Sequence, residues 1–249
     1  MTRAPRAPRR RRRGLAALLV LLLVLAGVAV GADRAAAWYA EQRLAEQAAA
    51  WAVRAGAPTN EKPAVRVEGF PFLTQVLWGR YQGVDITARD VGAGGLLADR
   101  LDVHLGDVEL PFADLRRNDL SRARASVVTA TAHIPLSEFA TALSPRGVKV
   151  AVVGNRLRIE VPFDVAGFKS TVTALADVSA EGGKLRVRLS NMTAAGADLP
   201  QSVADAVSRE LSTIVEAPRL PYGLELQRVQ VTADGLVASA SGRNVRLAS

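Results

Sequence analysis

The chain carries two histidines, and they are the first residues to test for chemistry because histidine is the commonest general base in enzymes. His104 alternates with apolar neighbours on the polar side of a predicted strand, and His133 precedes Ile134-Pro135 at a strand end. Both positions favour structural roles. The sequence also contains no G-x-S-x-G elbow, P-loop or dinucleotide fingerprint. We therefore expect no catalytic residue and a protein that is not an enzyme.

Metal and cofactor chemistry finds little support in the composition. The chain has no cysteine, which excludes thiolate metal sites, disulfides and an acylated lipoprotein anchor. Residues 92–95 read GAGG and resemble a phosphate cradle, but no predicted helix follows to direct its amides at an anion, so a turn is expected. We expect no metal and no cofactor. Paired carboxylates of the glycosidase type remain open, because Asp and Glu are scattered along the chain.

Aromatic side chains concentrate in one short segment, residues 69–81, which reads GFPFLTQVLWGRY. It holds four of the twelve aromatic residues of the chain. Gly69, Pro71 and Gly79 interrupt it, so neither one helix nor one strand can run through it. Large apolar rings at an irregular stretch of backbone predict either a plug in the core or the mouth of an apolar pocket.

The positive charge of the chain lies in its N-terminal tail. Of 32 basic residues, seven stand at Arg3, Arg6 and Arg9 to Arg13, and the rest of the chain has a net charge of only +1. A body so close to neutral does not provide a phosphate-binding face. We therefore expect no nucleic-acid partner, in spite of a formal charge of +8.

An uncharged run of nineteen residues, Gly14 to Ala32, follows this tail. As a helix it is roughly 28 Å long, close to the hydrocarbon thickness of a bilayer. The arginines before it predict a cytoplasmic N-terminus (residues 1–13) and an exported remainder. Val30-Gly31-Ala32 would serve as a signal-peptide cleavage site, but the run is longer than the roughly 7–15 residues usual for signal peptides. An uncleaved membrane anchor is the favoured interpretation.

Residues 33–56 are rich in alanine and free of proline, which predicts a helix. Its apolar stripe consists mostly of small side chains, so another element can approach it closely: Ala37, Ala40, Leu44, Ala48, Trp51 and Ala55. Trp38 and Tyr39 lie off the stripe. They are expected either at the water–lipid interface or as a cap on the following domain.

Beyond the aromatic segment, apolar and polar residues alternate with the period of strands that have one buried and one solvated face. Two-residue hairpin turns are predicted at Gly154-Asn155, Gly182-Gly183 and Asp234-Gly235. Helical spacing recurs from Leu136 to Leu143 and from Val203 to Ile214. The expected fold class is α+β, with one long, curved, mostly antiparallel sheet wrapped around helices in a single domain, residues 33–249.

Two parts of the sequence carry a family resemblance. Val65 to Gln75, followed by Gly79-Arg80-Tyr81, is similar to the signature of the actinobacterial LmeA family of phospholipid-binding envelope proteins. Leu220 to Leu224 and Val229 to Leu236 resemble the ending of the same family, and the matches frame residues 64–247. The resemblance implies lipid binding in the cell envelope in support of lipoglycan elongation. It implies no catalytic residue.

An apolar groove would suit this implied ligand. A curved sheet whose apolar face is larger than one small-residue helix can cover leaves such a groove, and an acyl chain gains about 0.8 kcal/mol per buried CH₂ there. Arg80 could donate to a lipid phosphate. The candidate lipid-binding residues are Phe70, Phe72, Leu73, Leu77, Trp78, Arg80, Tyr81 and Tyr222.

The expected partners are a phospholipid or another acyl or prenyl lipid, together with the membrane reached by the N-terminal helix. Two other classes of function remain open at this point. One is an envelope enzyme that acts on lipid-linked glycans, and the other is a membrane-anchored adaptor that docks a protein partner.

Overall fold

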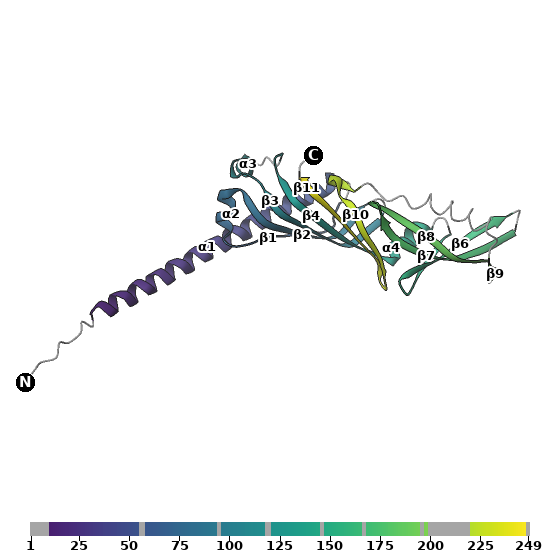
Figure 1. Ribbon diagram of the computed structural model, residues 1–249, viewed down its shortest axis with the longest axis horizontal. Helices are drawn as coiled ribbons and strands as arrows, with labels where there is room; N and C mark the ends of the chain where they lie inside the picture. Colours follow the sequence, from purple (N-terminus) through teal and green to yellow (C-terminus); the bar gives the residue numbers. More distant parts are fainter. Residues whose placement is uncertain are drawn as a thin grey trace, which may run out of the picture.

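One unbroken helix, α1 (Arg10–Arg54), joins the apolar run to the alanine-rich stretch that follows it. In the computed structural model the described residues are 10–54, 58–93, 96–117, 121–144, 147–165, 168–194, 197–198 and 220–247. No proline interrupts α1, and its 45 residues correspond to roughly 68 Å. Its N-terminal half projects away from the rest of the chain, and its C-terminal half lies along a sheet (Figure 1).

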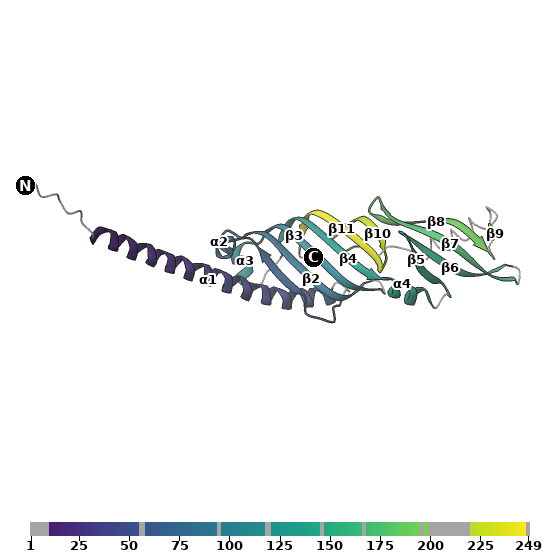
Figure 2. The same cartoon turned by 90° about the horizontal axis from the view of Figure 1, so that it is seen from below.

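The first sheet has six strands in the order β1-β2-β3-β4-β11-β10, all antiparallel to their neighbours. Figure 2 shows these strands crossing α1 obliquely. Short helices α2 (Phe72–Trp78) and α3 (Phe112–Arg117) follow β1 and β3. The strands are β1 (Ala64–Glu68), β2 (Arg80–Ala93), β3 (Leu96–Glu109), β4 (Arg124–Pro135), β10 (Glu225–Thr232) and β11 (Gly235–Arg246).

A second, five-stranded antiparallel sheet follows in the order β5-β6-β7-β8-β9. Helix α4 (Leu136–Leu143) leads the chain from β4 into this sheet, and the chain returns through the 3₁₀ turn η2 (Pro221–Gly223) to β10. The strands are β5 (Lys149–Val153), β6 (Arg156–Val165), β7 (Phe168–Glu181), β8 (Lys184–Ala194) and β9 (Ala197–Asp198).

The α+β class and the antiparallel pairing are confirmed, but the strands form two sheets where the sequence suggested one. The helix predicted from Leu136 to Leu143 is present as α4, and it stands in the chain between β4 of the first sheet and β5 of the second. The sheets share an apolar core that contains Leu157 and Ile159 of β6, Ala176 of β7, and Val229 and Val231 of β10, with β10 packed against β7 and β8. The helix expected from Val203 to Ile214 lies outside the described residues.

Two of the three predicted hairpin turns are confirmed. Gly154-Asn155 joins β5 to β6 and Gly182-Gly183 joins β7 to β8, with these glycines at positive φ. The third prediction was wrong by one residue, because Gly235 already pairs with Thr232 as the first residue of β11. A Cβ on Gly235 would collide with the carbonyl oxygen of Ile134. Glycine is needed there for close approach to β4.

Candidate functional site

One continuous apolar row crosses all six strands of the first sheet. In order of pairing it consists of Val65, Ile86, Val103, Ala130, Ala240 and Leu226. The rows beside it on the same face are also apolar, with Val84, Leu105 and Val128 on one side and Ala88, Leu101 and Ala132 on the other. Alternation within each strand places these side chains on a common face, which we call the inner face.

The inner face is covered incompletely. The small side chains Ala36 and Ala40 of α1 pack at its β1 end, and the second sheet packs at its β10 end. Between them Val103, Leu105 and Ala130, on β3 and β4, stay half-buried. Accessible apolar surface flanked by a helix of small residues can accept a hydrocarbon chain without displacing a packed core.

The aromatic segment divides into a buried and an exposed part. Phe72 and Tyr81 are buried, with ring centroids 6.5 Å apart and tilted by 44°. Burial raises the pKa of the Tyr81 phenol. These two rings belong to the core at the α2 end, as the plug interpretation expected. Both were predicted as lipid-binding residues, and from the core they could act only indirectly.

Four other apolar side chains of this segment face solvent. Phe70, Leu73, Leu77 and Trp78 are 56%, 44%, 72% and 77% exposed. Arg80 is exposed too, and its Nε lies 3.7 Å from Glu109 Oε1. Exposed ion pairs of this kind contribute little to stability. Tyr222 lies elsewhere, on η2 beside β11, at φ 59° and partly exposed.

Asp33 fixes the position of α2, and sequence reasoning did not select it. It is a buried carboxylate on α1 that accepts hydrogen bonds from the backbone N–H groups of Phe72 (3.0 Å) and Leu73 (2.8 Å). The N-cap residue of α2, Pro71, makes no side-chain cap of its own. The available signal was that Asp33 is the first charged residue after the apolar run.

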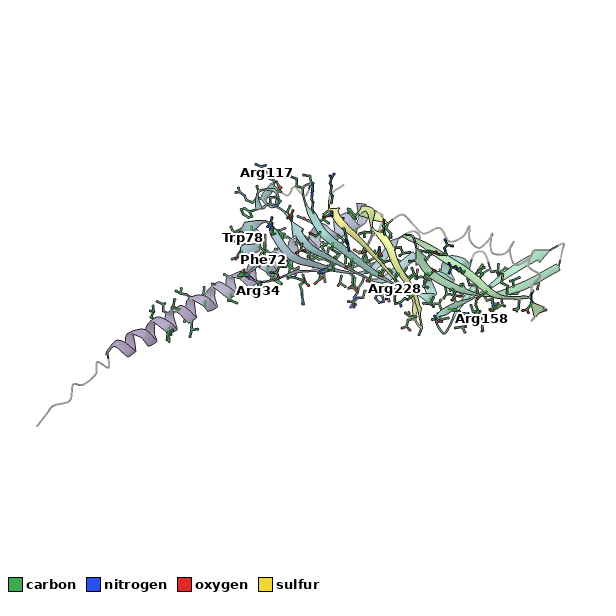
Figure 3. All side chains as sticks on the ribbon, in the orientation of Figure 1. Arg34, Phe72, Trp78, Arg117, Arg158 and Arg228 are labelled. Atoms are coloured by element: carbon green, nitrogen blue, oxygen red, sulfur yellow. The ribbon has the colours of Figure 1, made fainter. Side chains whose placement is uncertain are left out.

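Arg34 reinforces the same junction. Its Nη2 donates to Asp33 Oδ2 at 2.7 Å and to the Gly69 carbonyl at 3.3 Å, and its guanidinium lies 5.3 Å from the centre of the Phe70 ring. Figure 3 shows Arg34, Phe72 and Trp78 together at the end of the sheet where the exposed half of α1 departs. The aromatic segment is therefore held where the apolar run ends.

Polar side chains line the opposite face of the first sheet. The row next to the apolar one contains Arg66, Asp85, His104 and Thr129. His104 Nδ1 lies 2.7 Å from Asp85 Oδ1, which agrees with the predicted place of His104 on the polar side. These four residues line a cleft of about 600 Å³, to which Glu41 of α1 and Val65, Ile86 and Val103 of the apolar row also contribute.

Asp102, from the following row, also lines this cleft. Hydrogen bonding from Arg100, with further help from Thr87 and His133, outweighs burial and lowers the pKa of the Asp102 carboxyl. His133 itself is half-buried and stands opposite Arg100 on β3. Neither histidine lies on the inner face.

Three possible metal ligands come together beside this cleft. One ligand atom each from Glu68, Asp85 and His104 lies within 4.8 Å of the others. The absence of a side chain at Gly83 makes the arrangement possible, because a Cβ there would approach Glu68 Oε2 to 2.5 Å. Surface carboxylates commonly form such groups as ion pairs. That the chain needs no metal stays a prediction.

Comparison with known proteins identifies the family. The family model of LmeA-like phospholipid-binding proteins matches residues 31–241, which is most of the chain. No curated protein matches the chain significantly. The matched range contains the inner face, the aromatic segment and the junction at Asp33, but not the greater part of the apolar run. The chain belongs to the LmeA-like phospholipid-binding family.

Proposed function

We propose that this protein binds a phospholipid or a polyprenyl-type lipid on the inner face of its first sheet, without catalysing a reaction. It does so in the cell envelope, where it supports the formation of the envelope or of lipoglycans. Residues 1–13 form a cytoplasmic tail, residues 14–32 an uncleaved membrane anchor, and residues 33–249 a single extracytoplasmic domain.

The observation that carries this proposal is the apolar row of six strands, half-buried over β3 and β4, in a chain of a phospholipid-binding family. Val103 and Leu105 have no charged neighbour in their own rows on β2 and β4. Each CH₂ of an acyl chain that enters gains about 0.8 kcal/mol. A modest length of chain is therefore enough for useful affinity, and no titratable group is required.

The continuity of α1 supports the anchor. Its exposed apolar side chains extend from Leu18 to Val30, and the only helix among the described residues that is long and apolar enough to cross a membrane is α1. Trp38 and Tyr39, just beyond, are exposed and do not pack into the domain, which favours their location at the water–lipid interface. Asp33 ties the end of the apolar run to α2 through two hydrogen bonds.

A photoreactive phospholipid with a diazirine on its acyl chain tests the proposal. The full chain is incorporated into nanodiscs that contain this lipid, illuminated, digested and mapped by mass spectrometry. We expect labelled residues on the inner face of β3 and β4, because an acyl chain reaches them only after it leaves the bilayer. Labels confined to α1 would contradict lipid binding on the inner face.

Competition identifies the lipid class in the same experiment. Unlabelled phospholipid and unlabelled polyprenyl phosphate are added separately, and the better competitor for the β3 and β4 labels is the preferred ligand. Incubation with a lipid-linked sugar tests the enzyme alternative. Turnover of the lipid-linked sugar by the wild type that is lost in His104→Gln would favour an enzyme over a binding protein. A stable complex with another protein, with no lipid bound, would favour the adaptor.

A further inference from the structure

Helix α2 presents an apolar surface that no described element covers. Phe70, Leu73, Leu77 and Trp78 are exposed, and Leu73 and Leu77, four residues apart, lie on the same side of the helix. The opposite side of α2 is packed, since Phe72 and Gln75 are buried. Leu73, Leu77 and Trp78 are thus on the outward side of a helix that is packed on its other side, and Phe70 lies just before it. We call Phe70, Leu73, Leu77 and Trp78 the α2 surface.

The α2 surface is held at a defined level along α1. Asp33 is the first charged residue after the apolar run, and it receives both hydrogen bonds from the start of α2. Gln75 fixes the other side of α2, since its Nε2 donates to the Glu68 carbonyl at 3.0 Å and its Oε1 accepts from Gln82 N–H at 2.9 Å. If α1 spans the bilayer up to Ala32, α2 lies at the bilayer surface.

We propose that the α2 surface inserts into the outer interfacial layer of the membrane that α1 spans. This inference rests on the proposed anchoring by α1. The occupant follows from continuity, because the exposed apolar side of α1, from Leu18 to Val30, ends beside α2. Tryptophan, here Trp78, is one of the residue types enriched at this depth of a bilayer.

The neighbouring helix adds groups that suit a lipid surface. α3 lies beside α2 at the membrane-proximal end of the first sheet (Figures 1 and 2). Its Phe112 is exposed, and so are Arg116 and Arg117 in its last turn. Arginines flanking an apolar surface attract anionic lipid headgroups. If a protein partner or a second copy of this chain covered α2, nothing would require the α2 surface to lie where the apolar run of α1 ends.

Insertion of the α2 surface would fix the orientation of the domain relative to the bilayer. With α1 alone as a tether, the domain could rotate about the helix axis and tilt away from the lipid. A second contact through α2 holds the end of the sheet that carries Tyr81, at the start of β2, against the headgroups. A lipid then leaves the bilayer beside the protein and does not cross open water.

The absence of cysteine makes the test direct. Leu77→Cys is labelled with the environment-sensitive dye NBD in the otherwise cysteine-free full chain, incorporated into nanodiscs of phosphatidylcholine and phosphatidylglycerol. The matched control is Asn155→Cys, an exposed position in the β5–β6 turn of the second sheet. Two quenchers are compared: aqueous iodide and lipids that carry a spin label near the headgroup.

We expect blue-shifted emission at position 77, with quenching by the spin-labelled lipid several-fold stronger than at position 155, and weak quenching by iodide. Iodide quenching at position 77 as strong as at position 155 would overturn the proposal. A label protected from both quenchers would also overturn it, because the α2 surface would then be covered by protein. Trp78→Cys provides a second label site if Leu77→Cys fails to fold.

Failure of this inference is distinguishable from failure of the proposed function. Acyl-chain labels on β3 and β4 together with an aqueous position 77 leave lipid binding intact and reject insertion of α2. A full chain that cannot be incorporated into nanodiscs rejects the anchoring by α1, and the insertion of α2 falls with it. A lipid-exposed position 77 without labels on β3 and β4 supports insertion and rejects lipid binding on the inner face.

Discussion

The carboxylate of Asp33 accepts a hydrogen bond from the backbone N–H of Leu73 at 2.8 Å, across a separation of 40 residues in sequence. This contact joins the helix that carries the apolar run to the helix that carries the exposed aromatic segment. Pro71 has no amide N–H and makes no side-chain cap, so the start of α2 depends on α1 for its hydrogen-bond acceptors. The helix that carries the apolar run and the start of α2 are thus one structural unit.

Loss of this contact should destabilise the α2 end of the domain. Asp33→Ala leaves two N–H groups without their acceptor, and we expect a loss of about 2 kcal/mol in the free energy of unfolding. Urea unfolding of the full chain in nanodiscs, followed by circular dichroism, measures it. Asp99→Ala, an exposed carboxylate on β3, is the control. Equal stability of the two variants would contradict a capping role for Asp33.

The aromatic segment provides a pair of variants with opposite expected effects. Phe72 is buried against Tyr81, so Phe72→Ala should cost about 3–5 kcal/mol of stability. Trp78 is exposed, so Trp78→Ala should change stability by no more than about 0.5 kcal/mol and weaken membrane contact instead. Thermal unfolding and nanodisc quenching separate the two effects. A large loss of stability in Trp78→Ala would show that its ring is packed.

Charge on the inner face should reduce lipid binding. Val103→Asp places a carboxylate in the apolar row, where an acyl chain would have to desolvate it, and labelling by the photoreactive lipid should fall several-fold. Thr129→Asp adds the same charge on the polar face of the same sheet and should leave labelling unchanged. If Val103→Asp does not fold, Val103→Thr tests the same point with less strain. Equal labelling in both Asp variants would contradict the assignment of the inner face.

Two glycines at hairpins should differ in their tolerance of a side chain. Gly235→Ala forces a Cβ against the backbone of Ile134 at a φ of 150°, and we expect a loss of more than about 3 kcal/mol. Gly154→Ala meets no neighbouring atom and only adopts the left-handed conformation, at a cost of about 1 kcal/mol. Chemical denaturation ranks them. A small loss of stability in Gly235→Ala would mean that the end of β4 can move away from the added Cβ.

The polar cleft should contribute to stability in a pH-dependent way. The pKa of Asp102 is lowered in the folded protein, chiefly by its hydrogen bond with Arg100, so the unfolded chain binds the proton more readily. The stabilisation is complete above the ordinary carboxyl pKa of about 4 and is lost as pH falls through the lower folded value. Solvent screens this partly exposed pair, so it contributes about 1 kcal/mol or less.

Stability measured against pH for the wild type and Asp102→Asn tests this. The variant should be less stable at neutral pH and should converge with the wild type in acid. A parallel offset between the stabilities of wild type and Asp102→Asn at every pH would reject the linkage.

Asp85→Asn combined with His104→Gln should leave acyl-chain labelling of β3 and β4 unchanged, because these residues lie on the polar face.

Local pattern was enough to predict much of the fold. Uncharged residues from Gly14 to Ala32 predict the exposed apolar half of α1, and strict alternation predicts which residues of β2 and β3 share a face. The turns at Gly154-Asn155 and Gly182-Gly183 were predictable because glycine readily adopts the positive φ that these turns have in the structure. Each of these features depends on neighbours within a few residues, so the order of amino acids carries it.

The candidate site depended on contacts that no local pattern reports. Only the folded chain shows that the strands form two sheets, that Phe72 is buried while Trp78 is exposed, and that Val103 is half-buried. A buried and an exposed aromatic residue look alike in the sequence. Whether such a ring is buried depends on which distant parts of the chain pack against it. The bond between Asp33 and Leu73 has the same origin, since hydrogen bonding across 40 residues leaves no periodic trace in the sequence.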